Sequence, residues 1–261
     1  MLQALFKEKL GRAIQGGYFQ PIEDTLTSSV IGLLQYLPDA LFWELLRDSC
    51  GSGGSLLPRS IGEIKEIHFW ERMDAKGTYN SQSVEPDVWI ETEAFDVIIE
   101  AKRSDSSYDN AQSTYQWFNE IVALDNHYDN DYDKELIFIA MGGNESLKNQ
   151  SFSVNGKEFI IYTASWFDLL ASILKHRAAG LEHGTETNTL RILDDSIKAM
   201  QYHHIVHTVW FDSLTAMRIH DDAENYLRAD WIFENRSFLA AITESCNRIE
   251  FETLSGIWTI R

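Results

Sequence analysis

Three charged residues at the ends of two predicted strands carry the chemistry of this sequence. Glu100 and Lys102 end one apolar run, and Asp87 precedes another. Side chains of a strand alternate between its faces, so Glu100 and Lys102 point to the same face, about 6.6 Å apart along the chain. If strands at 84–92 and 95–103 pair across the tight turn between them, Asp87 lies opposite the same end. The spacing therefore predicts two carboxylates and one ammonium at one place.

A divalent cation would stabilise this group of charges. Carboxylates held close together repel each other, and a buried lysine loses its hydration. Asp87, Glu100 and the backbone carbonyl of Ala101 offer the hard oxygen ligands that Mg²⁺ prefers, with Mn²⁺ as a substitute. A water on such a metal has a lowered pKa and becomes a nucleophile for phosphorus. Lys102 can orient or deprotonate that water, or hold the phosphate.

A Glu-x-Lys pattern on an exposed strand is commonly a solvated ion pair, but the surrounding residues argue against that interpretation. The apolar run Val97, Ile98 and Ile99 indicates a strand buried on both faces. Charged residues at the end of such a strand indicate a functional site. Asp96 shares the face of Glu100 but lies about 13 Å away along the strand. Asp96 is therefore assigned to the turn and not to the site.

Hydrophobic periodicity predicts the elements that position these residues. The expected helices cover residues 2–15, 25–48 with a break near Pro38, 108–124 and 164–176. The expected strands cover residues 64–71, 84–92, 95–103, 136–141 and 158–162. Helices that alternate with strands in this way are typical of the α/β class.

The same pattern predicts two regions. Residues 1–177 are expected to form one α/β domain, followed by a linker at 178–188, where two glycines interrupt polar residues. Residues 189–261 are predicted to be a mainly helical C-terminal extension with a short extended end at 257–260. This extension is the candidate docking surface for a partner protein.

Composition excludes several classes of protein. The net charge is −18, with the acidic excess spread evenly, so the chain lacks the basic footprint of a general nucleic-acid binder. No run of about 18 uncharged apolar residues is present, which argues against a membrane span. The N-terminal residues lack a signal-peptide pattern, and Cys50 and Cys246 match no zinc or disulfide spacing. We therefore expect a cytoplasmic protein with no membrane partner.

Three further patterns are rejected as sites. The stretch 50–55, rich in Gly and Ser, lacks the Gly-Lys-Ser/Thr ending of a phosphate-binding loop. The acidic run 129–133 is followed by Lys134, where a calcium loop requires glycine. His203 and His207 are one helical turn apart, but no third zinc ligand follows in a metalloprotease pattern. We interpret residues 50–55 and 129–133 as loops, and the two histidines as ordinary residues of a helix.

In motif and element order, the sequence resembles the PD-(D/E)XK nuclease superfamily. Pro86-Asp87 is followed, thirteen residues after Asp87, by Glu100-x-Lys102. The order of a helix, a three-strand meander, a helix and a further strand over roughly residues 25–165 is similar to the core of that superfamily. The resemblance implies a restriction-endonuclease-like central mixed sheet flanked by helices, and Mg²⁺-dependent hydrolysis of phosphodiester bonds, usually in DNA. It assigns Asp87 and Glu100 as metal ligands and Lys102 as the catalytic lysine.

The resemblance also implies two more site residues. Many members carry an acidic residue in the helix before the sheet that completes the metal shell, and Glu44 is best placed, with Glu63 and Glu66 as rivals. Many carry a glutamine in the helix after the lysine, and Gln112 fits as a further catalytic residue. The Q-x-x-x-Y pattern of one branch is not met, because Tyr115 follows Gln112 by only three residues.

A chain this acidic would be repelled from DNA, and a basic partner would offset the repulsion. We therefore expect the nuclease subunit of a multi-protein prokaryotic system, with a helicase, a translocase or a DNA-sensing protein as partner. The habits of the superfamily suggest anti-phage defence as the setting, and a homo-oligomer is left open. The alternative functions are a catalytically silent interaction subunit with the nuclease fold and, less favoured, an acidic DNA mimic.

Overall fold

The computed structural model describes residues 3, 4, 7, 9, 14–15, 18–19, 21–108, 110–128, 133–146 and 148–206. The chain divides into two compact units, residues 1–207 and residues 208–261, and the second lies outside the described residues. His207, Cys246, the expected extended end at 257–260 and most of the acidic run 129–133 also lie outside them. So does most of the helix expected at 2–15, of which Ile14–Gln15 instead form strand β1, paired with β2 (Tyr18–Phe19).

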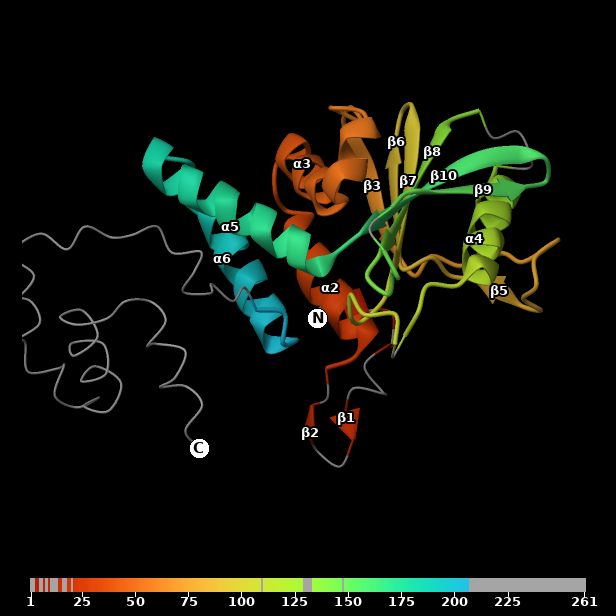
Figure 1. Cartoon of the computed structure of the whole chain (residues 1–261), viewed down its shortest axis with the longest axis horizontal. Coiled ribbons are helices and arrows are strands. Elements are labelled where there is room, and N and C mark those ends of the chain that lie inside the picture. The colour runs from red at the N-terminus through yellow and green to blue at the C-terminus, as the bar shows by residue number, and fades with distance from the viewer. Residues whose placement is uncertain are drawn as a thin grey trace, which may run out of the picture. The chain divides into compact units, whose positions relative to one another are not determined.

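A six-stranded mixed sheet forms the centre of the first unit (Figure 1), with the strand order β3-β6-β7-β8-β10-β9. The strands are β3 (Ile64–Phe69), β6 (Val88–Thr92), β7 (Phe95–Ala101), β8 (Glu135–Met141), β9 (Gln150–Val154) and β10 (Lys157–Ala164). β3, β6 and β7 are antiparallel neighbours, β7, β8 and β10 run parallel, and β9 pairs antiparallel with β10. The predicted α/β class and central mixed sheet are thereby confirmed.

Helices cover both faces of this sheet (Figure 1). On one face lie α2 (Glu23–Leu34), α3 (Asp39–Ser49), α5 (Trp166–His183) and α6 (Thr187–Tyr202). On the other face lies α4 (Thr114–His127), beside the short hairpin of β4 (Met73–Asp74) and β5 (Ser83–Val84). Within the described part of the chain, none of the helices is both long enough and apolar enough to span a membrane.

Two hydrophobic cores explain why the strands appear in the sequence as continuous apolar runs. Val97 and Ile99 of β7 belong to the core under α2, α3, α5 and α6. Ile98, between them, belongs to the core under α4, together with Phe138 of β8. Because successive side chains alternate in direction, an apolar run fills both cores at once.

Local sequence signals set several helix boundaries. The break expected near Pro38 is confirmed, because proline lacks the N–H needed inside a helix and here separates α2 from α3. A short 3₁₀ helix, η2 (Gly51–Leu56), occupies the expected loop at 50–55. At the start of α5, Oγ of Ser165 accepts the N–H of Asp168 at 3.1 Å. Gly184 ends α5 with a φ of 74°, which glycine adopts without strain.

Several predicted boundaries differ from those in the structure. The linker expected at 178–188 is largely helical, since α5 continues to His183. α6 packs against α2 and α5, so the boundary between the two units falls after residue 207 rather than between 177 and 189. The helix expected from residue 108 begins only at Thr114. β9 was not predicted, because its mostly exposed, polar residues carry little hydrophobic signal.

Candidate active site

β6 and β7 bring Asp87 and Glu100 to the same end of the sheet. In this antiparallel pair, Val88 lies opposite Ile99. Asp87 comes one residue before Val88, and Glu100 comes one residue after Ile99, so the same register places the two acids opposite each other. Both side chains are buried. The convergence expected from the strand period is therefore present in the structure.

Two hydrogen bonds fix the carboxylate of Asp87. Its Oδ1 accepts the indole N–H of Trp70 at 2.9 Å, and its Oδ2 accepts the backbone N–H of Ala101 at 2.8 Å. Each carboxylate oxygen can accept more than one hydrogen bond or metal bond, so both retain a free acceptor position. Asp87 is thus oriented and still able to bind a cation.

Trp70, which the sequence did not single out, reaches Asp87 through an uncommon backbone conformation. Its φ is 48°, a value that bulky residues rarely adopt. In this conformation the backbone N–H of Trp70 also donates to the carbonyl of Asp87, at 3.2 Å. Conformations of this kind persist only where the surroundings impose them, and they concentrate at functional sites.

Lys102 is buried among carboxylates at the same place. Its Nζ lies 2.5 Å from Oε1 of Glu100 and 3.6 Å from Oε1 of Glu23, and it donates to the carbonyl of Ala101 at 3.3 Å. Burial by itself lowers the pKa of Lys102, but the charges of Glu100 and Glu23 outweigh burial and raise the pKa. Lys102 is therefore protonated and can act as a cation and hydrogen-bond donor.

Two glycines that follow β8 give Lys102 its space. Gly142 has a φ of 72° and Gly143 a φ of 62°. A Cβ on Gly142 would lie 2.8 Å from the carbonyl oxygen of Lys102, and a Cβ on Gly143 would lie 2.8 Å from Cγ of Lys102. Only glycine combines this conformation with such a close approach. Gly142 and Gly143 therefore allow the backbone after β8 to lie directly against Lys102.

The acidic residue that α2 contributes to the cluster is Glu23, whereas the predicted Glu44 lies in a different group of side chains. Glu23 lies in the first turn of α2 with its carboxylate next to Lys102. The sequence offered no signal for it, because helix starts commonly carry acidic residues whatever their function. The rivals Glu63 and Glu66 are exposed to solvent, and they do not belong to the cluster.

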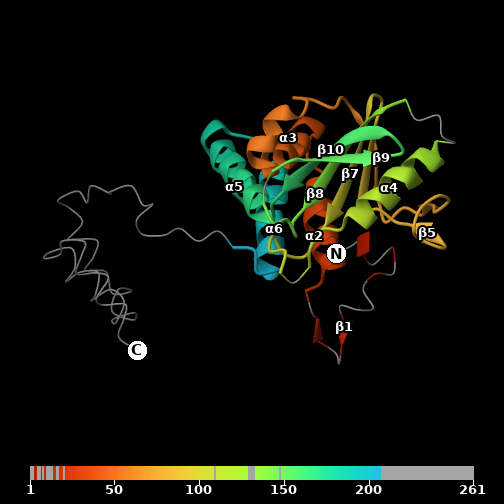
Figure 2. The same cartoon turned by 45° about the vertical axis from the view of Figure 1, so that its right-hand side comes forward.

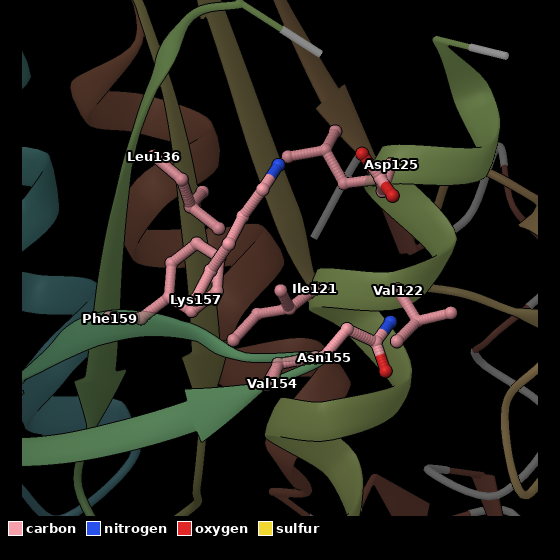
Figure 3. Close-up of a pocket in the computed structure, with 9 residues that line it drawn as sticks. Ile121, Val122, Asp125, Leu136, Val154, Asn155, Lys157 and Phe159 are labelled. Carbon is pink, nitrogen blue, oxygen red and sulfur yellow. The ribbon is translucent and has the colours of Figure 1, made fainter. Parts of the chain in front are cut away.

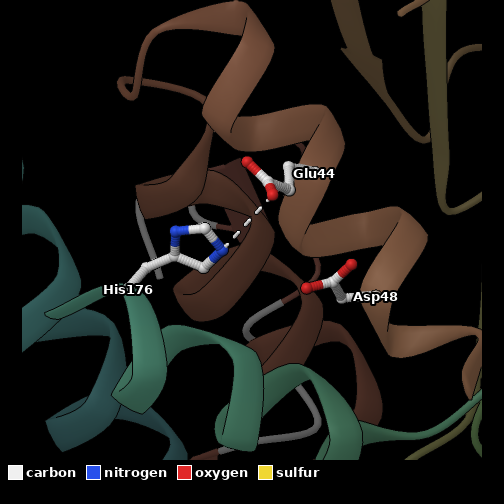
Figure 4. A group of neighbouring side chains, drawn as sticks. All are labelled: Glu44, Asp48 and His176. Carbon is white, nitrogen blue, oxygen red and sulfur yellow. Dashed lines mark ion pairs between the residues drawn. The ribbon is translucent and has the colours of Figure 1, made fainter. Parts of the chain in front are cut away.

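Glu44 instead belongs to a group between α3 and α5 (Figure 4), which also contains Asp48 and His176. Its carboxylate lies 3.8 Å from Nε2 of His176. The guanidinium of Arg47 lies 3.9 Å from Glu44 and 3.8 Å from Asp48, and Oγ of Ser172 donates to Asp48 at 3.0 Å. Arg47 already supplies positive charge to both carboxylates, and we assign no metal to this partly exposed group.

Gln112 does not present its amide to the carboxylates, because it precedes α4 rather than lying within it. Its Nε2 donates to the backbone carbonyls of Glu100 and Gly142 at 3.0 and 3.1 Å. Its Oε1 accepts the indole N–H of Trp117 at 3.0 Å. Gln112 thus joins the ends of β7 and β8. The glutamine that reaches a carboxylate is Gln116, whose Nε2 donates to Oε1 of Glu100 at 2.9 Å.

Glu120, one turn after Gln116 on α4, adds a buried carboxyl group that the sequence analysis missed. Burial and then the neighbouring charge of Glu100 raise the pKa of Glu120 well above its usual value. Its Oε2 has no hydrogen-bond partner among the described residues. The available signal was a glutamate beside Trp117 and Ile121, on the apolar side of a helix.

Four carboxyl groups therefore surround one ammonium, Lys102. They are those of Asp87, Glu100, Glu120 and Glu23. Burial and then the charges of Glu100 and Glu23 raise the pKa of Asp87 well above its usual value. A divalent cation would relieve this excess of negative charge, and carboxylate and carbonyl oxygens are the donors that Mg²⁺ prefers. Asp87, Glu100 and the carbonyl of Ala101 supply oxygen donors of these two types.

A small apolar cavity of ≈ 40 Å³ lies elsewhere in the first unit (Figure 3). It is enclosed by α4, β8 and the β9–β10 hairpin, and its walls include Ile121, Val154 and Phe159. None of the four clustered carboxyl groups lines it. The cavity is therefore not part of the candidate active site.

Fold and site together define an α/β protein whose central mixed sheet gathers buried carboxylates and a lysine at one end. The chain is 30% identical over 217 residues to a protein of Pasteurella multocida (strain Pm70) described as "Uncharacterized protein PM0110". The match covers 75% of this chain and 74% of the Pasteurella protein, and the chain belongs to the same family as that protein. No protein-family model and no solved structure matches the chain.

Proposed function

We propose that this protein is a Mg²⁺-dependent nuclease with a restriction-endonuclease-like core. The observation that carries the proposal is the burial of Asp87, Glu100 and Lys102 against one another at the end of two antiparallel strands. The excess of carboxyl groups around the single lysine supports a cation in the working protein. The Pro86-Asp87 and Glu100-x-Lys102 pattern supports the same chemistry.

In phosphodiester hydrolysis, some residues of the site would bind a cation and Lys102 would bind the phosphate. Asp87, Glu100 and the carbonyl of Ala101 would hold Mg²⁺, which lowers the pKa of a bound water and neutralises charge on phosphoryl oxygens. Lys102, protonated, donates to an oxygen of the phosphate and stabilises the charge that develops there. Gln116 keeps the carboxylate of Glu100 in place through the hydrogen bond at 2.9 Å.

The proposal includes a basic partner. The net charge of −18 opposes the approach of DNA, and a helicase, translocase or DNA-sensing subunit with a basic surface would remove that barrier. We propose a cytoplasmic, prokaryotic assembly of this kind, with defence against phage as its setting. An acidic DNA mimic would display its carboxylates to solvent, whereas those of Asp87, Glu100 and Glu120 are buried.

Cleavage assays with the full-length protein test the proposal. The substrates are a supercoiled plasmid and a single-stranded oligonucleotide, incubated with Mg²⁺, with Mn²⁺ or with EDTA. We expect metal-dependent cleavage that falls by about 100-fold or more in Glu100→Gln and in Lys102→Ala, because each removes charge from the reacting centre. Glu44→Gln, on the surface of α3, is the matched control and should cleave as the wild type does.

A metal titration gives a readout that does not depend on cleavage. Isothermal calorimetry with Mn²⁺ should show binding to the wild type and to Glu44→Gln, and weak binding to Glu100→Gln. Absence of binding by the wild type, or unchanged cleavage in both site variants, contradicts the proposal. Binding without cleavage, even with a co-purified partner, favours the catalytically silent subunit.

A further inference from the structure

Two exposed aromatic side chains lie next to each other beside the candidate active site. Tyr79, in the loop between β4 and β5, is 67% exposed, and Tyr115, in the first turn of α4, is 66% exposed. Their ring centroids are 5.2 Å apart with an interplanar angle of 82°. The ring of Phe118 packs against that of Tyr79, with 5.0 Å between the ring centroids. We call Tyr79 and Tyr115 the tyrosine pair.

The tyrosine pair is held in place before any ligand arrives. Oδ1 of the buried Asn119 accepts the backbone N–H of Tyr79 at 2.8 Å, and its Nδ2 donates to Oδ1 of Asn80 at 3.1 Å. Nδ2 of Asn126 donates to the carbonyls of Asp74 and Lys76 at 3.0 and 2.7 Å. Helix α4 thus fixes the loop at several points. Exposed rings on a fixed backbone lose little conformational freedom when they bind.

The tyrosine pair is adjacent to the catalytic cluster along α4. Tyr115 directly precedes Gln116, whose amide donates to the carboxylate of Glu100 at 2.9 Å. Figures 1 and 2 both show the β4–β5 hairpin beside α4. Tyr115 and Gln116 are consecutive residues of α4, so the tyrosine pair lies at the same end of the helix that supplies Gln116 to the carboxylates.

The chemistry of the tyrosine pair favours an unpaired base over a duplex. An acidic protein gains little from the phosphate charges that dominate duplex binding. Stacking of a base on an aromatic ring does not depend on charge, and it is the usual way to hold single strands. Bases inside a duplex are already stacked on their neighbours and do not present a free face.

We propose that Tyr79 and Tyr115 form a stacking site for an unpaired nucleobase next to the scissile phosphate, so that the substrate class is single-stranded or frayed nucleic acid. This inference rests on the proposed nuclease function and adds a substrate class to it. The occupant is a nucleic-acid base, and a protein partner on the same surface is the competing outcome of the test.

Binding measurements with full-length protein test the stacking site without requiring cleavage. The probes are a fluorescein-labelled single strand of twenty thymidines and a labelled duplex of the same length, with Ca²⁺ in place of Mg²⁺. We expect the wild type to bind the single strand more tightly than the duplex, and Tyr79→Ser/Tyr115→Ser to lose about 10-fold or more of the single-strand affinity. Duplex affinity should not change.

Two further variants separate stacking from other effects of the substitutions. Tyr79→Phe/Tyr115→Phe keeps both rings and should bind the single strand nearly as the wild type does. Tyr36→Ser removes a tyrosine that is 63% exposed at the end of α2 and should have no effect. Circular dichroism spectra and melting temperatures establish that each variant folds.

Three results would overturn the stacking site. The first is equal binding of single strand and duplex by the wild type. The second is unchanged single-strand binding by the double serine variant, which would leave the tyrosine pair to a protein partner. The third is a loss of affinity by the double serine variant that is equal for the single strand and the duplex. If Glu100→Gln abolishes cleavage while the double serine variant cuts single strands normally, the nuclease function stands and the stacking site does not.

Discussion

The two ends of the β6–β7 strand pair carry the same kinds of residue but differ in their charge balance. At the turn end, Oδ1 of Asp96 accepts the indole N–H of Trp89 at 2.9 Å, with Nζ of Lys134 3.5 Å away. At the other end, Oδ1 of Asp87 accepts the indole N–H of Trp70, also at 2.9 Å, with Lys102 nearby. A tryptophan, an aspartate and a lysine therefore occur at both ends.

The difference lies in the number of acids that each lysine must balance. Lys134 contacts Asp96 and Glu91, of which Glu91 is partly open to solvent. Lys102 lies among four carboxyl groups, and the pKa values of two of them, Asp87 and Glu120, are raised well above normal by burial and by Glu100. A fold does not need such an excess, and a cation would remove it. The comparison indicates that charge balance, rather than burial of charge alone, distinguishes a candidate metal site from a structural ion pair.

The largest expected effect on stability comes from breaking the turn-end pair. Asp96→Asn removes the charge of a fully buried carboxylate that pairs with Lys134, and we expect it to lower the free energy of unfolding by about 3 kcal/mol. Glu100→Gln should cost less, because three other carboxyl groups still surround Lys102. Urea denaturation of the metal-free proteins measures both. A larger loss for Glu100→Gln than for Asp96→Asn would contradict the charge-balance argument.

The two tryptophans offer a second, matched comparison. Trp70→Phe keeps a buried ring but removes the N–H that orients Asp87, so the affinity for Mn²⁺ should fall by about 10-fold. Trp89→Phe removes the equivalent hydrogen bond to Asp96 and should leave Mn²⁺ affinity unchanged. Calorimetric titration of both variants with Mn²⁺ measures these affinities. Equal affinities in Trp70→Phe and the wild type would show that the strained Trp70 has only a packing role.

The smallest expected effect is on the pH dependence of stability. Carboxyl groups with a raised pKa in the folded state stabilise the protein fully below their unfolded pKa of about 4, and this contribution is lost as pH rises through the folded pKa. The metal-free protein should therefore lose stability above about pH 4, in part through Glu120. Glu120→Gln, which keeps the shape without the charge, should flatten that decline.

Denaturation of metal-free Glu120→Gln at several pH values measures this effect, which we expect to reach about 1 kcal/mol at neutral pH. Glu44→Gln on the surface of α3 is the matched control and should keep the slope of the wild type. A decline in stability that is as steep in Glu120→Gln as in the wild type would show that Glu120 does not take part in the charge excess.

The centre of the candidate site was predictable from the sequence because it depends on local rules. The period of two in a strand places Glu100 and Lys102 on one face, and a tight turn determines which residue of the preceding strand faces Glu100. The same rules assigned Asp96 to the opposite end, where the structure places it beside Trp89 and Lys134. These inferences need only residues that are near each other in the chain.

The rest of the site was decided by the tertiary structure. Glu23, Gln116 and Glu120 enter because α2 and α4 pack at the end of β7, and helix packing selects among acids and amides that look alike in the sequence. Glu44 lies only two turns into α3 yet faces α5. Sequence patterns specify which face of a helix or strand is buried. The neighbour that a particular side chain contacts depends on how separate elements pack, and this packing is set by contacts between residues that are far apart in the chain.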